Sequence, residues 1–447
     1  MAYNLTEGSI QRSIFRLALP MLAANLLQDL FNIVDTIFVG RLGDDQLAAL
    51  TTSGLILGLI MVVMIGISTG TVALVARHIG SKERKKAEND AIQAILLAAF
   101  FTLVISPFLY FATPYLFDLL GADPEVIHYG GQYMRITAIG AFTISLSISM
   151  SASLQGSGDA MTPMKIMIFS TVLNIILDPL LIFGIGPLPE MGVAGSALAT
   201  VVARGAGLPL FFYALLRGRT LLKLSLNEVK IDLRTMGAMF RIGIFSGLQA
   251  LVRNISNFAL IGLTYSFGTS TAAAYGVGTR LRMIVLMVGF AFAAASATLV
   301  GQNLGAGKPK RAEKSAWIAV GFYEVLLAAL LLVFVLMPEE IMGIFSNTPE
   351  VVSIGAGYVV ILGAAFPFLG LSVVLSRSFG GAGETKVPMI VTAISLIAIR
   401  IPLAYFLAST IGVSGIWYAL LVSNIIEGST FAFLFRRGKW KGKRVNV

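Results

Sequence analysis

Long apolar segments dominate this chain, and their length limits the folds that it can adopt. Twelve segments are near or above the about 20 residues that a helix needs to cross a bilayer. Their approximate limits are 13–39, 47–76, 91–112, 128–155, 163–185, 192–216, 237–263, 271–301, 316–336, 351–376, 388–408 and 412–435. Unbroken runs favour helices over the short alternating segments of a β-barrel. With a mean hydropathy of +0.85, the chain is predicted to be an all-α integral membrane protein with twelve transmembrane helices.

The loops between these segments alternate in charge. Basic residues gather within 77–86, 217–234, 308–314 and 436–444, whereas the opposite loops carry mainly acids within 118–125, 190 and 339–350. By the positive-inside rule, we expect both termini on the cytoplasmic side of the cell membrane. The same distribution explains the net charge of +10 without nucleic acid as a partner.

The chain repeats itself at an offset of 225 residues. Phe15 matches Phe240, and Gly158 matches Gly383. Each half holds six segments that begin on the same side, which is typical of parallel repeats with a substrate site between the halves. We therefore expect two pseudo-symmetric six-helix lobes, 1–216 and 237–447, joined by a cytoplasmic loop at 217–236. The second lobe would end in a basic cytoplasmic tail.

Polar residues at helical spacing interrupt two apolar segments. Ser170, Asn174 and Asp178 are four residues apart, so they share one helix face. A carboxylate at the centre of a spanning helix costs about 2.5–3.5 kcal/mol. The first segment carries a similar stripe, which consists of Asn25, Gln28, Asn32 and Asp35. We expect the two stripes to face each other, and the alternative is a polar contact that only holds two helices together.

The two halves differ in these polar positions. Three polar residues of the first half align with apolar residues of the second: Asp35 with Leu260, Asn174 with Ile399, and Asp178 with Leu403. We therefore predict one coupling site, in the first lobe. Carboxylate, amide and hydroxyl oxygens suit a proton or Na⁺, and Thr200 is a plausible further oxygen. Pro20 removes a backbone hydrogen bond and gives the first helix a place to bend.

Six other charged residues also lie within apolar segments: Arg204, Arg253, Arg282, Arg400, Glu324 and Glu427. Arg253 and Arg400 are expected to pair with carboxylates or to bond carbonyl groups. Signatures of an enzyme are absent from the sequence. There is no cysteine, the two histidines lie at segment ends, and no phosphate-binding loop is present. We therefore expect neither an enzyme nor an ATP-driven pump.

The sequence resembles the multidrug and toxic compound extrusion (MATE) family. The matching motifs are Val34-Asp35-Thr36-Ile37-Phe38-Val39-Gly40, Leu173 to Pro179, Gly192 to Thr200 and Val300 to Gly307. The resemblance covers essentially the whole chain, and it implies two six-helix lobes around a central cavity. It also implies a first-lobe cation site at Asp35, Asn174, Asp178 and Thr200, able to hold H⁺ or Na⁺, and a helix bend at Pro20.

One departure from the family pattern concerns the seventh segment. One branch of the family carries an acid there, whereas residues 247–253 contain none. This places the chain nearer the prokaryotic, DNA-damage-inducible (DinF-like) branch and argues against a second-lobe cation site. The candidate residues of the substrate cavity are Gln28, Asn32, Tyr133, Arg135, Gln249 and Arg253.

The predicted function is a cation-coupled multidrug antiporter that exports organic, often cationic or amphipathic compounds by alternating access. We expect it to act on small-molecule drugs or toxic metabolites, to work as a monomer in the lipid bilayer, and to need no cofactor beyond the coupling ion. The main alternative is a flippase for lipid-linked saccharides from the same superfamily, and Arg253 and Arg400 favour it. An intramembrane lipid enzyme and a passive channel are weaker alternatives.

Overall fold

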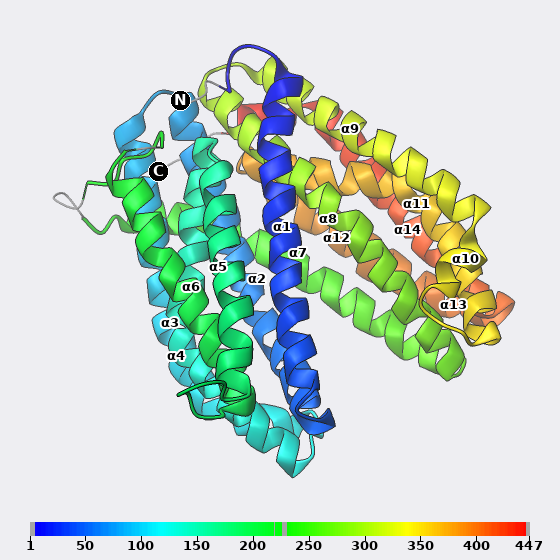
Figure 1. The fold of residues 1–447 in the computed structure, drawn as a ribbon. Helices are drawn as coiled ribbons and strands as arrows, with labels where there is room; N and C mark the ends of the chain where they lie inside the picture. Colours follow the sequence, from blue (N-terminus) through cyan, green and yellow to red (C-terminus); the bar gives the residue numbers. More distant parts are fainter. Residues whose placement is uncertain (1–4, 219, 226–229, 444–447) are drawn as a thin grey trace. The chain divides into compact units, whose positions relative to one another are not determined.

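The chain folds into helices throughout the part that the structure describes. A computed structural model describes residues 5–218, 220–225 and 230–443, and no strand occurs in these ranges (Figure 1). Twelve helices within them are long and apolar enough to cross a membrane, which confirms the predicted number of spans. The all-α prediction is therefore confirmed.

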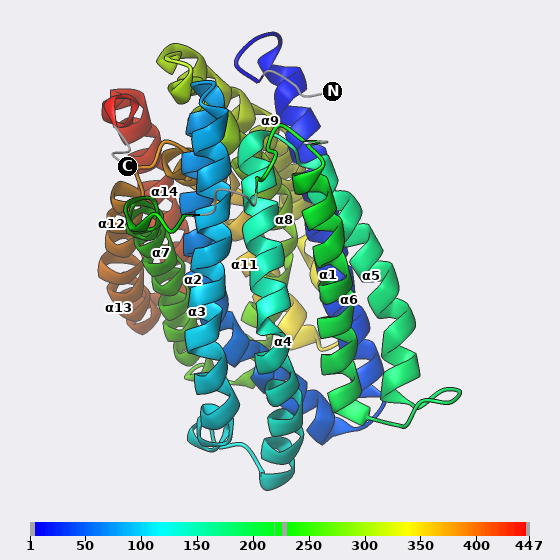
Figure 2. The same cartoon turned by 90° about the vertical axis from the view of Figure 1, so that its left-hand side faces the viewer.

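The chain divides into two compact units, and the first spans residues 19–243. Its complete helices are α2 (Asp44–Gly80), α3 (Arg84–Leu119), α4 (Pro124–Ser157), α5 (Met161–Ile182) and α6 (Gly192–Leu216). Within this unit, α4 packs against α2, α3 and α6, and α5 packs against α6 (Figure 2). The helix α4 therefore forms the centre of the first unit.

The second unit comprises residues 5–18 and 244–443 of the described chain. Its complete helices are α8 (Thr269–Gly305), α9 (Pro309–Leu336), α10 (Pro338–Gly343), α11 (Pro349–Gly381), α12 (Lys386–Ala393), η2 (Ile394–Arg400), α13 (Ile401–Ile411), α14 (Val413–Arg437) and η3 (Lys439–Gly442). Here α11 is central, because it packs against α8, α9 and α14. Inside this unit the rings of Tyr275 and Trp417 stack on each other, and the ring of Tyr358 meets both of them edge to face.

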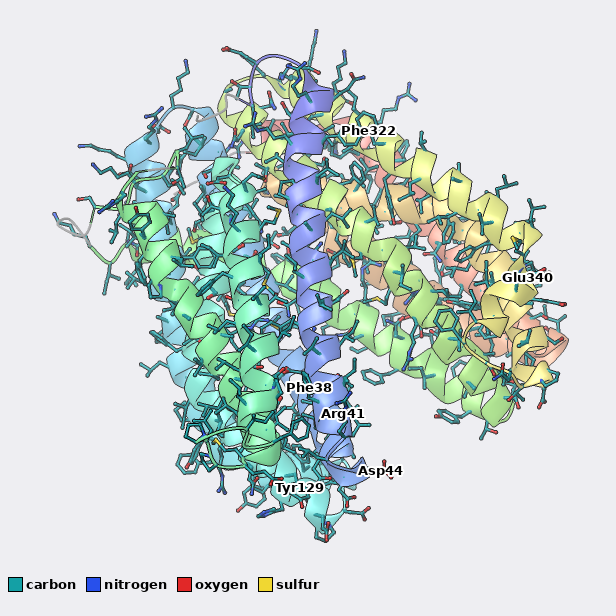
Figure 3. The ribbon with its side chains drawn as sticks, in the orientation of Figure 1. Phe38, Arg41, Asp44, Tyr129, Phe322 and Glu340 are labelled. Atoms are coloured by element: carbon teal, nitrogen blue, oxygen red, sulfur yellow. The ribbon has the colours of Figure 1, made fainter. Side chains whose placement is uncertain are left out.

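Two helices belong to both units. The helix α1 (Ile10–Gly40) changes unit between Ala18 and Leu19, and α7 (Leu233–Tyr265) changes between Gly243 and Ile244. These two positions are equivalent in the sequence repeat. The beginning of α1 is fixed in the second unit by the ring of Phe15, which lies 4.5 Å from that of Phe322 on α9. Phe322 is labelled in Figure 3. The other end of α1 stays in the first unit, where the guanidinium of Arg41 lies 5.8 Å from the ring of Phe38.

The beginning of α7 packs against α2 through glycines. A Cβ atom at Gly70 would lie 2.5 Å from the carbonyl oxygen of Met239, and one at Gly66 would lie 2.7 Å from that of Gly243. Such backbone approach is typical of membrane helices, because dispersion contacts replace the hydrophobic effect there. The glycines of α2 thus attach the first turns of α7 to the first unit.

The predicted loop at 217–236 ends earlier than expected, because α7 begins at Leu233. Asp232 caps the helix by accepting bonds from the hydroxyl of Thr235 over 2.6 Å and from its N–H over 3.2 Å. These bonds lower the pKa of Asp232. Gln93 on α3 holds the same segment by donating to the carbonyl of Lys230 and accepting from the N–H of Asp232. The loop is therefore attached to the first unit, although residues 219 and 226–229 lie outside the described residues.

The segment predicted as one helix over 388–408 contains an irregularity. A π-helical stretch, Ile394–Arg400, separates α12 from α13. Pro402, two residues after the end of this stretch, has no N–H to donate and crowds the carbonyl group one turn earlier. A widened π turn relieves this conflict, and such turns are frequent at functional sites.

Candidate functional site

Two carboxylates meet inside the first unit. Asp35 on α1 and Asp178 on α5 lie within hydrogen-bonding reach of each other. Asp35 is 6% exposed and Asp178 is fully buried. The polar stripes predicted on the first and fifth segments therefore do face each other at these two residues.

Three neighbouring side chains surround the two acids. Thr200 on α6 donates a hydrogen bond of 3.1 Å to Asp35, and Asn174 donates one of 3.1 Å to Asp178. Ser196, one turn before Thr200 on α6, lies near Asp35, but its buried hydroxyl makes no hydrogen bond within the described chain. The sequence analysis missed Ser196, although its spacing of four residues from Thr200 places both hydroxyls on one helix face.

Close helix packing brings these residues together. Gly195 on α6 lies directly on the backbone of Leu181 and Ile182 in α5, so a side chain there would collide with it. The same contact lets Thr200, further along α6, reach the acid on α1. On α5, the four-residue spacing turns Ser170, Asn174 and Asp178 inward, and all three are buried.

The cluster contains oxygen atoms that its neighbours leave without a donor. Within the described chain, no hydrogen bond reaches Oδ1 of Asp35, Oδ2 of Asp178 or Oδ1 of Asn174, although all three atoms are buried. A buried acceptor without a donor is costly. A shared proton would satisfy both acids, and a hard cation such as Na⁺ would bind the same carboxylate, amide and hydroxyl oxygens. No group of three or more His, Cys, Asp and Glu residues that could hold a metal ion occurs in the described ranges.

A cavity of about 250 Å³ with polar and apolar lining residues lies in the first unit. Its lining includes Gln28, Ser170 and Arg204. The guanidinium of Arg204 donates to Gln28 over 2.7 Å and lies 4.9 Å from the ring centre of Phe31. Arg204 is also within electrostatic range of Asp35. It therefore links the cavity to the acid pair, a role that spacing along one helix could not indicate.

The other first-lobe candidates occupy different surroundings. Tyr133 on α4 is buried within electrostatic range of both acids. Asn32 is exposed and accepts a bond from Gln28 over 3.2 Å. Arg135 is exposed on α4, with its guanidinium 5.7 Å from the ring of Tyr110. Pro20 lies inside α1, next to the point where that helix changes unit.

The second-unit candidates belong to a buried hydrogen-bond network. Gln249 donates to Ser376 over 2.9 Å and to Thr392 over 2.8 Å. Arg253 forms an ion pair of 2.8 Å with Glu427, which is fully buried. The expectation that Arg253 pairs with a carboxylate is confirmed by this contact. Arg400 instead donates to the hydroxyl of Ser423 over 2.7 Å.

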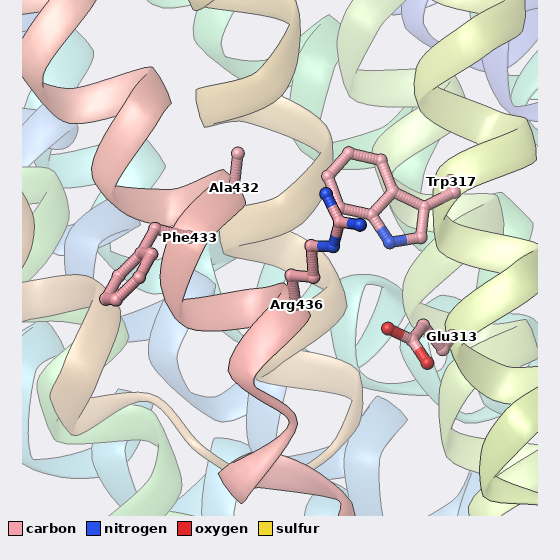
Figure 4. A pocket seen from close by; sticks show the side chains of 5 residues that line it. All are labelled: Glu313, Trp317, Ala432, Phe433 and Arg436. Carbon is pink, nitrogen blue, oxygen red and sulfur yellow. The ribbon is translucent and has the colours of Figure 1, made fainter.

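A larger cavity, of about 460 Å³, lies between α9 and α14 (Figure 4). It is lined by Glu313, Trp317, Ala432, Phe433 and Arg436. Glu313 is already paired there with Lys441 over 2.6 Å. None of the predicted site residues lines this cavity, so its volume does not make it the better candidate.

Comparison with known proteins gives matches over nearly the whole chain. A family model described as MatE matches residues 20–180 and again residues 246–406, which agrees with the internal repeat. The chain is similar to a probable multidrug resistance protein NorM of Thermotoga maritima, with 26% identity over 98% of this chain and 94% of that protein. It is also similar to an FAD transporter of Shewanella oneidensis, with 27% identity over 97% and 96%.

Solved structures show the same fold. A crystal structure of MATE in the bent conformation aligns with a TM-score of 0.91 at 24% identity, over 97% of this chain and 96% of that one. A transporter of the MOP superfamily from Pyrococcus furiosus, described as having a binding pocket of reverse polarity, aligns with a TM-score of 0.90 at 23% identity, over 98% of both chains.

Proposed function

Because the chain belongs to the MATE family of membrane transporters, we propose that it exports organic, often cationic or amphipathic compounds in exchange for H⁺ or Na⁺. Its relatives are named as multidrug resistance and multidrug export proteins. The chain is a multi-pass membrane protein. On the proposed topology, both termini lie in the cytoplasm, and the transporter works as a monomer without a cofactor.

The observation that supports coupling is the buried pair of Asp35 and Asp178. Two adjacent carboxylates in a membrane interior repel each other, and the cost of burying them falls when a cation neutralises one of them. Asn174 and Thr200 complete the proposed coupling site with two further oxygens. Arrival and release of the ion would then change the interactions between α1, α5 and α6.

The energy available from one ion is sufficient for useful export. One charge that moves down a potential of about 100 mV supplies about 2.3 kcal/mol. By the relation between free energy and concentration ratio, this corresponds to roughly a 50-fold gradient of substrate. One coupling site in the first unit is therefore enough.

Alternating access requires a part of the chain that can change shape. We propose that α1 bends at Pro20 when the acid pair gains or loses its ion. Proline interrupts the hydrogen bonds of a helix interior and lowers the cost of a bend there. The acid pair lies on the same helix, at Asp35, so a change at the ion site can act on the bend directly.

Dye transport in proteoliposomes tests the coupling proposal. We expect an imposed H⁺ or Na⁺ gradient to drive transport by the wild type, and we expect Asp178→Asn and Asp35→Asn to abolish this gradient-driven transport. Asp29→Asn is the matched control, because Asp29 is an exposed acid on the same helix as Asp35. Gradient-driven transport that persists in Asp178→Asn would refute the proposed site. If the rate of dye transport by the wild type depends on neither the H⁺ nor the Na⁺ gradient, antiport is refuted.

A further inference from the structure

Four arginines from different helices gather inside the second unit. Arg253 lies on α7, Arg282 on α8 and Arg377 on α11, and Arg400 ends the π-helical stretch. Arg400 is within electrostatic range of Arg282 and Arg253, and Arg253 is within range of Arg377. We call these four residues the arginine cluster.

The hydrogen bonds of Arg282 and Arg400 do not balance the charges of these two residues. Arg253 has a carboxylate partner, Glu427. Arg282 donates to the side-chain oxygen of Asn257 over 3.1 Å, and Arg400 donates to a serine hydroxyl. These two acceptors are neutral, so they satisfy N–H groups without cancelling positive charge. In addition, Nε of Arg282 is buried without an acceptor among the described residues.

Positive charges that lie close together in a membrane interior repel each other and need a counter-charge. The guanidinium group matches phosphate and carboxylate oxygens with two parallel hydrogen bonds. An anion held between Arg282 and Arg400 would therefore supply both the missing charge and an acceptor for the buried N–H group.

The local backbone supports a binding role for these residues. The π turn before Arg400 has no counterpart in α5, the equivalent helix of the first unit, which is a regular α-helix from Met161 to Ile182. The cluster is also open to ligands in part, because the side chain of Arg253 is 35% exposed and that of Arg282 is half-buried.

We propose that the arginine cluster binds the anionic group, a phosphate or a carboxylate, of an amphipathic molecule that the transporter carries. The cargo would then combine an apolar body with a negative group. This inference rests on the proposed transport function, and it extends the predicted cationic substrates to anionic ones. The same chemistry is found in soluble phosphorylated compounds and in the headgroups of anionic lipids.

Two fluorescent probes test the inference, because they share one ring system and differ in a single phosphate. Purified full-length protein in a neutral detergent is titrated with flavin mononucleotide and with riboflavin. We expect the phosphorylated probe to bind at least about tenfold more tightly. Equal binding of the two probes would overturn the proposal.

Two variants separate anion binding from structure. Arg282→Gln keeps a donor for Asn257 but removes the charge, and we expect it to lose about tenfold in affinity for flavin mononucleotide while riboflavin binding is unchanged. Arg280→Gln is the matched control, since Arg280 is exposed on the same helix. A loss that is equal for both probes in Arg282→Gln would overturn the proposal. Glu427→Gln removes the carboxylate partner of Arg253, so we expect tighter binding of the phosphorylated probe.

Two further experiments identify the source of the anion and test anion binding separately from ion coupling. Displacement of flavin mononucleotide by phosphatidylglycerol, but not by phosphatidylcholine, would support the cluster as a lipid-headgroup site; no displacement by either lipid would support a soluble cargo. Asp178→Asn should keep the preference for the phosphorylated probe while it loses gradient-driven transport. If Asp178→Asn transports normally, the coupling proposal fails, but the Arg282→Gln result still decides the anion site.

Discussion

The hydroxyl of Thr200 donates a hydrogen bond of 3.1 Å to the carboxylate of Asp35, although 165 residues separate the two in sequence. The bond joins α6 to α1 inside the first unit, and Gly195 makes it attainable by letting α6 lie directly on α5. The acid on α1 therefore accepts a side-chain hydrogen bond from a neighbouring helix.

Replacement of Thr200 tests the importance of this bond for ion coupling. A hydrogen bond to a charged group contributes about 1.5–3 kcal/mol, which corresponds to roughly ten- to hundredfold in ion affinity. We expect Thr200→Val, which keeps the shape of the side chain, to reduce gradient-driven transport by at least about tenfold. Thr200→Ser keeps the hydroxyl and should transport nearly as the wild type. Equal rates for the Val and Ser variants would exclude the hydroxyl from the coupling site.

The packing of α7 on α2 leads to a prediction about stability. A methyl group at Gly70 would collide with the carbonyl oxygen of Met239, whereas one at Gly58 on the same helix would meet nothing within 4 Å. We expect Gly70→Ala to destabilise the protein by about 1–3 kcal/mol, as overpacking does in tight interiors. Gly58→Ala should be neutral or slightly stabilising. Thermal unfolding in detergent compares the two, and similar midpoints would contradict the close packing.

Local sequence patterns were sufficient to predict the spans, the repeat and the inward face of α5. Each of these depends on residues a few positions apart or on a fixed offset. The two polar stripes predicted that the first and fifth helices face each other, but they did not show whether Asp35 and Asp178 meet. Thr200 was a candidate both as a further oxygen on the sixth segment and through the family resemblance. The functional assignment of these residues stays a prediction.

Other features depend on contacts between distant segments, and the sequence could not indicate them. Arg253, Arg282, Arg377 and Arg400 lie on separate helices, so no spacing shows that they converge. The change of unit within α1 and α7 likewise follows from tertiary packing. By contrast, the early start of α7 was visible in the sequence, because an aspartate directly before a helical segment, here Asp232, is an N-cap signal.

The cap at Asp232 predicts a pH dependence of local stability. The hydroxyl of Thr235 is the main cause that lowers the pKa of Asp232 below its ordinary value of 3.8. The ionised form is therefore favoured in the folded state, so its stabilisation is complete above pH 3.8 and is lost as the pH falls through the lower folded value. Because water screens a group at the surface, we expect an effect below about 1 kcal/mol.

Hydrogen exchange at the amides of Arg234 and Thr235 measures this effect. Protection should fall on acidification in the wild type, after correction for the intrinsic exchange rates. In Asp232→Asn, protection should be lower near neutral pH and nearly independent of pH. An unchanged pH profile in this variant would show that another group controls the first turn of α7.

Pro20 gives a test of the proposed bend in α1. The helix is continuous from Ile10 to Gly40, and Pro20 is the second residue of the part that belongs to the first unit. Alanine restores the N–H group and removes a steric conflict that costs about 3 kcal/mol in a helix interior. Pro20→Ala should therefore unfold at a higher temperature but transport at least about tenfold more slowly, because a stiffer helix bends less readily.

Pro107→Ala in α3 is the control, since it makes the same chemical change in a helix without a predicted bend. If Pro20→Ala transports as fast as Pro107→Ala, then bending at Pro20 is not part of the transport cycle.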